Sequence, residues 1–286
     1  MANLKEIRNR ITSISSTMQI TSAMKMVSAA KLKKAQDAIT AMRPYSSKLT
    51  ELLQNLSATL DSDAGGVYAT QRDVKKVLVV AITSNRGLCG GFNSSITKAA
   101  IKNAKENYST VSLDVLAIGK KGNDALSKTY NVIENNSTVF DDLTFANVAE
   151  IAEKLMSLYA DGTYDKIELI YNRFKNAATQ ITTIEQFLPI EPLADDAVVN
   201  SDYIFEPSKE EIVSDLIPKS LKTQLYKAIR DSFASEHGAR MTAMHKATDN
   251  ATDLRDDLLL TYNKARQAAI TNEILEIVGG AEALNS

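Results

Sequence analysis

The stretch that decides the fold is SEHGARMTAMHKATDNATDLRDDLLLTYNKARQAAITNEILEIVGGAEAL, residues 235–284. It contains no proline, and no glycine between Gly238 and Gly279. Apolar or small residues recur mostly at spacings of three and four, at Ala243, Ala247, Ala251, Leu254, Leu258, Tyr262, Ala265, Ala269 and Leu275. At about 1.5 Å per residue the pattern predicts a helix of roughly 60 Å or more, longer than a compact core requires.

The first sixty residues predict a second long helix. A heptad seam begins there, at Leu4, Ile7, Ile11, Ile14 and Met18. After a slip it is expected to resume at Val27, Ala30, Ala38, Met42, Tyr45, Leu49, Leu52, Leu56 and Leu60. Pro44 should bend this helix without ending it, because the apolar period continues through the proline.

Between the two predicted helices, the spacing of apolar residues changes and becomes typical of alternating strands and short helices, which predicts a small α/β domain. Strands are expected at 74–83, 113–118, 165–174 and 179–188, and helices at 93–106 and 145–159, with a short helix that follows residues 119–122 and ends at Tyr130. Lys175-Asn176 marks a hairpin turn, so the predicted sheet is parallel with an antiparallel edge. An acidic connector follows over 189–207, and Ser208 is the expected N-cap of the last helix.

Composition narrows the classes of function. The chain has 286 residues, a net charge of −2 and a pI near 5.8. Its overall charge therefore does not favour binding to nucleic acid or to a membrane surface. One cysteine, Cys89, excludes an internal disulfide and suits a reducing compartment. The N-terminus lacks a leader pattern and the run 77–82 is too short to span a bilayer, so we expect a soluble intracellular protein.

The loop 84–93, SNRGLCGGFN, lies between a predicted strand and a predicted helix, where a nucleotide-binding loop would lie. It matches neither G-x-G-x-x-G nor G-x-x-x-x-G-K-[ST], so a tight structural turn built on Gly87, Cys89, Gly90 and Gly91 is favoured. Catalysis by Cys89 needs a basic partner, and the chain's two histidines, His237 and His245, fall on the predicted C-terminal helix, where surface positions are expected. We therefore expect no catalytic residue, metal or cofactor.

Two polar sets on the helices are candidate contacts. Arg266 and Gln267 interrupt a small-residue stretch; they form either a solvated face or a grip on a partner's carboxylate. Lysines crowd one stretch of the N-terminal helix, at Lys25, Lys31, Lys33 and Lys34. They form either a solvated face or a docking surface for an acidic partner.

Three blocks, residues 4–36, 84–93 and 235–284, closely resemble the gamma-subunit family of F-type rotary ATP synthases. The resemblance extends over essentially the whole chain. It implies an antiparallel coiled coil of an N-terminal helix (1–60) and a C-terminal helix (208–284), with a central Rossmann-like α/β domain (74–190). It also implies a central rotating stalk that couples ion flow through a membrane rotor to ATP synthesis or hydrolysis at the beta-subunit sites, and that is not itself catalytic.

The resemblance also implies partners and contact residues. The partners are a ring of three alpha and three beta subunits, an epsilon subunit and the membrane c-ring, with no nucleic acid and no direct membrane insertion. The implied beta-subunit contacts are Arg266, Gln267, Arg240, Met24, Lys25, Lys31 and Lys33. The chain departs from the family pattern at Gln19 and Ser22, where the family often has lysines, and lacks the cysteine pair of photosynthetic relatives. We expect a bacterial protein, peripheral on the cytoplasmic face of the inner membrane.

Two other readings fit parts of the sequence. A non-rotary coiled-coil tether or scaffold has the same helical periodicity and would form a homodimer through its seam. An α/β enzyme using the loop 84–93 would bind a nucleotide or small ligand as an isolated chain.

Overall fold

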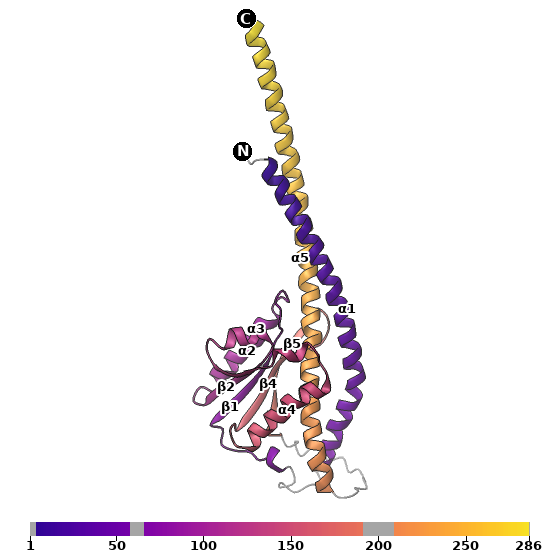
Figure 1. The fold of residues 1–286 in the computed structure, drawn as a ribbon, viewed down its shortest axis with the longest axis vertical. Coiled ribbons are helices and arrows are strands. Elements are labelled where there is room, and N and C mark those ends of the chain that lie inside the picture. The colour runs from indigo at the N-terminus through magenta and orange to yellow at the C-terminus, as the bar shows by residue number, and fades with distance from the viewer. Residues whose placement is uncertain (1–3, 58–65, 191–208, 286) are drawn as a thin grey trace. The chain divides into compact units, whose positions relative to one another are not determined.

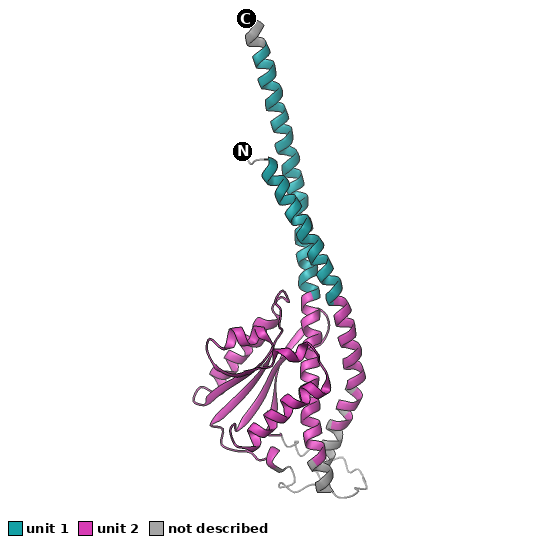
Figure 2. Cartoon of the chain, in the orientation of Figure 1, with its two compact units in different colours: residues 1–28, 241–286 teal, residues 29–240 magenta. Residues whose placement is uncertain are grey.

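The computed structural model describes residues 4–57, 66–190 and 209–285 (Figure 1). Two helices dominate it, α1 (Leu4–Ser57) and α5 (Lys209–Asn285), and a mainly parallel sheet lies between them in the chain. This confirms the predicted fold class. The chain divides into two compact units, residues 1–28 with 241–286 and residues 29–240, and both long helices contribute to both units (Figure 2). The predicted N-cap, Ser208, lies outside the described residues.

In the first unit, α1 and α5 pair in antiparallel orientation. The hydroxyls of Thr21 and Thr248 lie 2.8 Å apart, and the Thr252 hydroxyl donates to the Met18 sulfur at 3.3 Å. Partner numbers on α5 rise as those on α1 fall, which defines the antiparallel direction. Short hydroxyl side chains at the seam allow the two backbones to approach, and Ile7 is buried at the same seam.

The buried stripe of α1 is displaced from the predicted one. The five seam residues between Leu4 and Met18 are buried or half-buried, as expected. The resumed seam is wrong at Val27, Ala30 and Tyr45, which are exposed. It is correct at Leu49, which is buried, and Ala38 and Met42 are half-buried. The side chains of Leu52 and Leu56, and all of Leu60, lie outside the described part of the chain. The described buried positions after Met18 are Thr21, Ser28, Leu32, Ala35, Ile39 and Leu49. Ser28 is tolerated there because its hydroxyl donates to the Met24 carbonyl at 2.7 Å, which satisfies a polar group that hydropathy alone places outside.

Two prolines lie inside the long helices. Pro44 lies within α1 and Pro218 within α5, and neither ends its helix. The half-buried positions of α5 stop at Ala265, and every residue from 266 to 281 is exposed. The apolar stripe predicted beyond Ala265 is therefore not buried within this chain.

The described strands of the second unit form one five-stranded sheet in the order β3-β2-β1-β4-β5. The strands are β1 (Lys76–Ile82), β2 (Ser112–Ile118), β3 (Asn131–Asn135), β4 (Lys166–Phe174) and β5 (Gln180–Leu188). Only β5 among them is antiparallel to its neighbour, as the hairpin turn predicted. The sequence did not predict β3, a short edge strand whose residues alternate between exposed and half-buried positions.

Helices cover both faces of the sheet. The helices and short 3-10 turns of this unit are α2 (Phe92–Asn107), α3 (Lys120–Leu126), α4 (Phe145–Ala160), η1 (Gly66–Tyr68) and η2 (Ser137–Phe140). One core contains residues of α2 and α3 with Val77, Val79 and Ala81 of β1. The other contains residues of α4 and of the 217–229 part of α5 with Leu78 and Val80. Alternate β1 side chains thus enter opposite cores, as a strand buried on both faces requires.

The strand order creates a switch point between β1 and β4. The chain passes from β1 to β2 and β3 on one side, and then returns to place β4 on the other side of β1. In open α/β sheets a crevice forms at the carboxyl ends of such strands, and ligands commonly bind there. The loop after β1 and the N-terminus of α2 lie at this position, so it is the first place to search for a site.

Candidate functional site

The loop from Ser84 to Asn93 is held by its own side chains. Asn93 accepts a hydrogen bond from the Ser84 backbone N–H at 2.9 Å and donates to the Ser84 hydroxyl at 2.8 Å. The Ser84 hydroxyl in turn donates to the Arg86 carbonyl at 2.7 Å. The two ends of the loop are therefore tied together before any other element contacts it.

Two residues of this loop adopt left-handed backbone conformations. Gly90 has a φ of 59°, which glycine adopts without steric cost. Leu88 has a φ of 61° and its side chain is 65% exposed. A leucine in this region costs roughly 1–2 kcal/mol, so the surrounding contacts must hold it there. Of the predicted turn residues, Gly87 and Gly91 do not have positive φ, and sequence reasoning did not single out Leu88.

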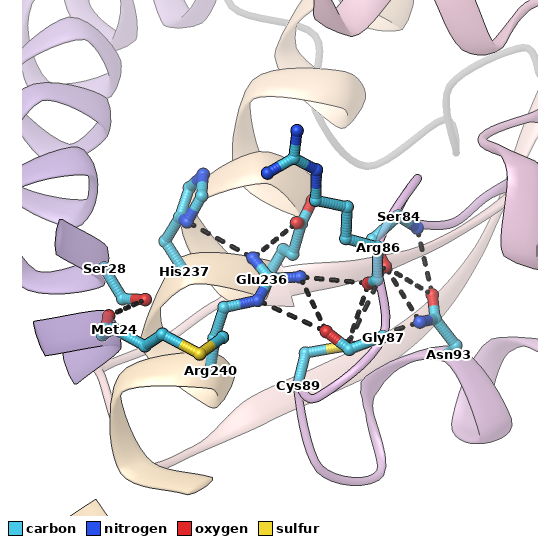
Figure 3. A network of polar contacts seen from close by, with 10 residues as sticks. All are labelled: Met24, Ser28, Ser84, Arg86, Gly87, Cys89, Asn93, Glu236, His237 and Arg240. Carbon is cyan, nitrogen blue, oxygen red and sulfur yellow. Dashed lines mark hydrogen bonds and ion pairs between the residues drawn. The ribbon is translucent and has the colours of Figure 1, made fainter. Parts of the chain in front are cut away.

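Arg240, on α5, binds the same loop from outside (Figure 3). Its Nη2 donates to the carbonyls of Arg86 at 3.0 Å and Gly87 at 3.3 Å, and its Nη1 donates to the Glu236 carboxylate at 2.6 Å. Arg240 is 7% exposed. All of these partners belong to the same chain, so the guanidinium is already engaged before any subunit is added.

Burial sets the titration of the groups around Arg240. Burial raises the pKa of Glu236, and the neighbouring Arg240 opposes that rise. Burial, together with the positive charges of Arg240 and Lys31, lowers the pKa of His237 to about 3. His237 is therefore neutral at physiological pH. It is buried against the Phe233 ring, with centroids 4.5 Å apart, so the expectation that it lies on the helix surface is wrong.

The Cys89 thiol is also buried, at 2% exposure. Burial raises its pKa, only partly offset by the hydrogen bond to Ser84. Its sulfur accepts from the Asn93 amide at 3.3 Å. A buried thiol with a raised pKa is held protonated, which makes it a poor nucleophile.

The other predicted contact residues are on helix surfaces. Arg266 and Gln267 are both exposed, on the part of α5 beyond Ala265. Met24 and Lys25 are half-buried, and Lys31 and Lys33 are exposed. Lys33 forms an ion pair with Asp37 at 3.3 Å, one turn later on α1.

The structure thus separates the predicted set. Arg240 joins the turn residues Gly87 and Cys89 in one network within the second unit. Sequence reasoning missed Glu236, although its spacing of four residues from Arg240 is a helical ion-pair signal. Of the other predicted contacts, Lys31 lies close enough to this network for its charge to lower the pKa values of Glu236 and His237.

The described ranges, 4–57, 66–190 and 209–285, contain neither a metal site nor a membrane-spanning helix. Within them, histidine, cysteine and carboxylate side chains form no group suited to hold a metal ion. None of the helices in those ranges combines the length and the apolar composition that a membrane span requires.

The fold defines a class of protein in which two long terminal helices pair in antiparallel orientation and a mixed α/β domain separates them in the chain. A family model described as ATP synthase matches residues 3–284. The ATP synthase gamma chains of Flavobacterium psychrophilum and Flavobacterium johnsoniae are 76% and 75% identical, covering 99% and 100% of both chains compared. This chain belongs to the ATP synthase gamma chain family.

Solved structures agree with this assignment. A chain of the Tetrahymena thermophila mitochondrial ATP synthase central stalk and c-ring structure is 30% identical, with a TM-score of 0.61 over 80% of this chain and 99% of that chain. A chain of the Euglena gracilis mitochondrial enzyme, in a structure with OSCP, F1 and c-ring, has a TM-score of 0.70 at 23% identity, which supports the fold alone.

Proposed function

We propose that this chain is the central rotating stalk of a bacterial F-type ATP synthase, coupling ion flow through the membrane rotor to catalysis on the beta subunits. The observation that carries the proposal is the end of α5. Residues 266–281 are all exposed, yet they include the large apolar side chains Ile270, Ile274, Leu275, Ile277 and Val278, at 44% to 66% exposure. Apolar surface of this extent is covered by a partner in the working state.

The partner that fits this surface is a ring of alpha and beta subunits with an apolar bore. A helix exposed on all sides needs a partner that surrounds it, because a single flat surface covers only one face. Arg266 and Gln267 begin this exposed stretch and provide polar groups that grip a beta-subunit carboxylate. Met24, Lys25, Lys31 and Lys33 are proposed as a second contact, with an acidic segment of beta.

The mechanism that follows is mechanical. An asymmetric helical shaft contacts each of three beta subunits differently as it turns, so each contact biases its catalytic site by a differential interaction free energy. The chain itself carries out no bond-making step in this proposal. Two features support a non-catalytic role: the Cys89 thiol is buried and held protonated, and the carbonyls of Arg86 and Gly87 in the loop 84–93 are bound by Arg240.

Epsilon and the c-ring are proposed as the partners of the α/β domain, which places the assembled protein at the cytoplasmic face of the inner membrane as a peripheral subunit. The bacterial gamma chains that match over their whole length support this location.

Reconstitution tests the proposal directly. The purified chain is mixed with cognate alpha and beta subunits, and co-elution as one large complex and ATP hydrolysis are both measured. We expect one chain per ring and stimulated hydrolysis. A chain that stays separate from cognate alpha and beta and forms a homodimer instead would support the tether reading and contradict the stalk.

A further inference from the structure

We propose that Arg240 is an internal positioning residue: its guanidinium takes the place of a ligand at the switch point of the sheet and fixes the loop from Arg86 to Cys89. The resemblance to the family assigns Arg240 to a beta-subunit contact. The proposal gives it a role inside this chain that is independent of the stalk function.

The first step is the position of α5. The Ser232 hydroxyl donates to the carbonyl of Ile82, the last residue of β1, at 3.4 Å. Two turns later, a Cβ built on Gly238 would lie 3.1 Å from the carbonyl oxygen of Ala177, in the connection between β4 and β5. The helix therefore crosses the carboxyl ends of β1 and β4, where doubly wound folds bind their ligands.

The second step is the geometry of the guanidinium. Its planar fork offers donors in several directions, and here they bind two loop carbonyls and one carboxylate. Lysine has a compact point charge and cannot reproduce this set. Because Arg240 is 7% exposed and Glu236 also 7%, these bonds form away from bulk water, where they are strongest.

The third step is the strain in the loop. Leu88 is the one non-glycine residue with positive φ in the described ranges, and it directly follows the two residues whose carbonyls Arg240 binds. Its side chain is 65% exposed, so burial of its own apolar surface does not explain the conformation. The bonds from Arg240 on one side and the Ser84–Asn93 tie on the other hold the backbone there.

The reaction rate of the Cys89 thiol measures how often this loop opens. Cys89 is the single cysteine of the chain and is 2% exposed, so its reaction with a thiol reagent reports opening of this loop. The full-length chain, free and assembled with alpha and beta, is treated with 5,5′-dithiobis(2-nitrobenzoate) at low urea concentrations, where global unfolding is negligible. We expect Arg240→Ala to react about tenfold faster or more than the wild type, because hydrogen bonds to a charged group are lost. The rate should depend little on urea, as local opening exposes little surface.

Two matched variants separate a local clamp from general destabilisation. Ile217 is a residue of α5 that lies in the other core, and Ile217→Ala should lower global stability without opening the loop. Lys264→Ala removes an exposed cation of the same helix and should leave the Cys89 rate unchanged. Arg240→Lys keeps the charge and should give an intermediate rate, and it replaces Arg240→Ala if that variant does not fold.

Each contrary outcome overturns the proposal. A Cys89 rate in the folded, free Arg240 variants within twofold of the wild type would show that Arg240 does not hold the loop. Equal acceleration by Ile217→Ala at equal loss of stability would show that the effect is global. A defect confined to the assembled complex would assign Arg240 to beta instead, and would leave the stalk function intact.

Discussion

The Arg240 guanidinium lies 2.6 Å from the carboxylate of Glu236, one turn earlier on α5, and both side chains are about nine-tenths buried. A buried pair of this kind is costly to break, because removing one partner leaves the other charge without water or counter-charge. The exposed pair Lys33–Asp37 has the same spacing of four residues on α1, with side chains 77% and 64% exposed. The chain therefore contains a buried pair and an exposed counterpart for comparison.

We expect Glu236→Ala to lower the free energy of unfolding by about 3 kcal/mol, because Arg240 is left buried with only carbonyl partners. Asp37→Ala should lower it by less than about 0.5 kcal/mol, since solvent screens an exposed pair. Urea denaturation of both variants measures the difference. Equal effects of the two substitutions would contradict the description of Arg240 as a buried, paired charge.

The buried His237 should make stability depend on pH. Its pKa in the folded chain is about 3, below the ordinary value of 6.5, so the unfolded chain binds the proton more readily. Its contribution to stability is therefore complete above pH 6.5 and is lost as the pH falls from there towards 3. Between pH 7 and pH 5 the loss is on the order of 2 kcal/mol.

The check is the free energy of unfolding at pH 7 and pH 5 in three chains. His237→Gln should remove this part of the pH dependence. His245→Gln should keep it, because His245 is exposed and faces Asp249 on the same helix. Parallel pH profiles for the wild type and His237→Gln would mean that His237 titrates normally.

The positive φ of Leu88 predicts that its change to glycine has an unusually small effect on stability. Leu88→Gly should leave the free energy of unfolding within about 0.5 kcal/mol of the wild type, because relief of the positive φ offsets the greater freedom of glycine in the unfolded chain. Leu260→Gly makes the same change at a similar exposure, 61%, in the middle of α5, and should cost about 1 kcal/mol. Thermal melts of the two variants compare them. A Leu88→Gly variant as unstable as Leu260→Gly would show that the loop carries no strain.

Local periodicity explains why much of the fold is predictable from sequence. The seam from Leu4 to Met18 and the buried strand β1 depend on residues adjacent in the chain, so their patterns are visible without tertiary information. Strand β3 was missed because Asn131, Glu134 and Asn135 make it mostly polar, as an edge position permits.

The network around Arg240 could not be predicted, for a different reason. Its bonds join α5 to carbonyls more than 150 residues earlier in the chain, at Arg86 and Gly87, and backbone carbonyls have no signature in the sequence. For the same reason His237 was placed on the surface: a helical period identifies one face of a helix but does not show that a sheet and a loop cover a second face.

If Arg266 binds a beta subunit, its substitution should strongly lower ATP hydrolysis by the complex, although the side chain is exposed in the free chain. Arg266→Ala should lower ATP hydrolysis by the reconstituted complex about tenfold, the loss expected when a charge-assisted hydrogen bond is removed. Torque should fall with it. Lys264→Ala, an exposed cation two residues earlier, should change the rate by less than about twofold. Unchanged hydrolysis and torque in Arg266→Ala would remove Arg266 from the beta contact.

The apolar end of α5 makes opposite predictions for the free chain and the complex. Changing Ile270, Ile274 and Ile277 together to serine should leave the melting temperature of the free chain almost unchanged, because these side chains are 44%, 54% and 66% exposed. Serine and isoleucine also have similar helix propensities. In the complex the same side chains are proposed to be buried, so affinity for alpha and beta should fall about a hundredfold or more.

A second triple variant supplies the control for this test. Thr271, Asn272 and Glu273 lie between the isoleucines on the same exposed helix, and their change to serine removes no large apolar side chain. Its affinity for alpha and beta should stay close to that of the wild type. If the isoleucine variant assembled as tightly as this control, the end of α5 would not be enclosed, and a shaft turning inside a ring would lose its main structural support.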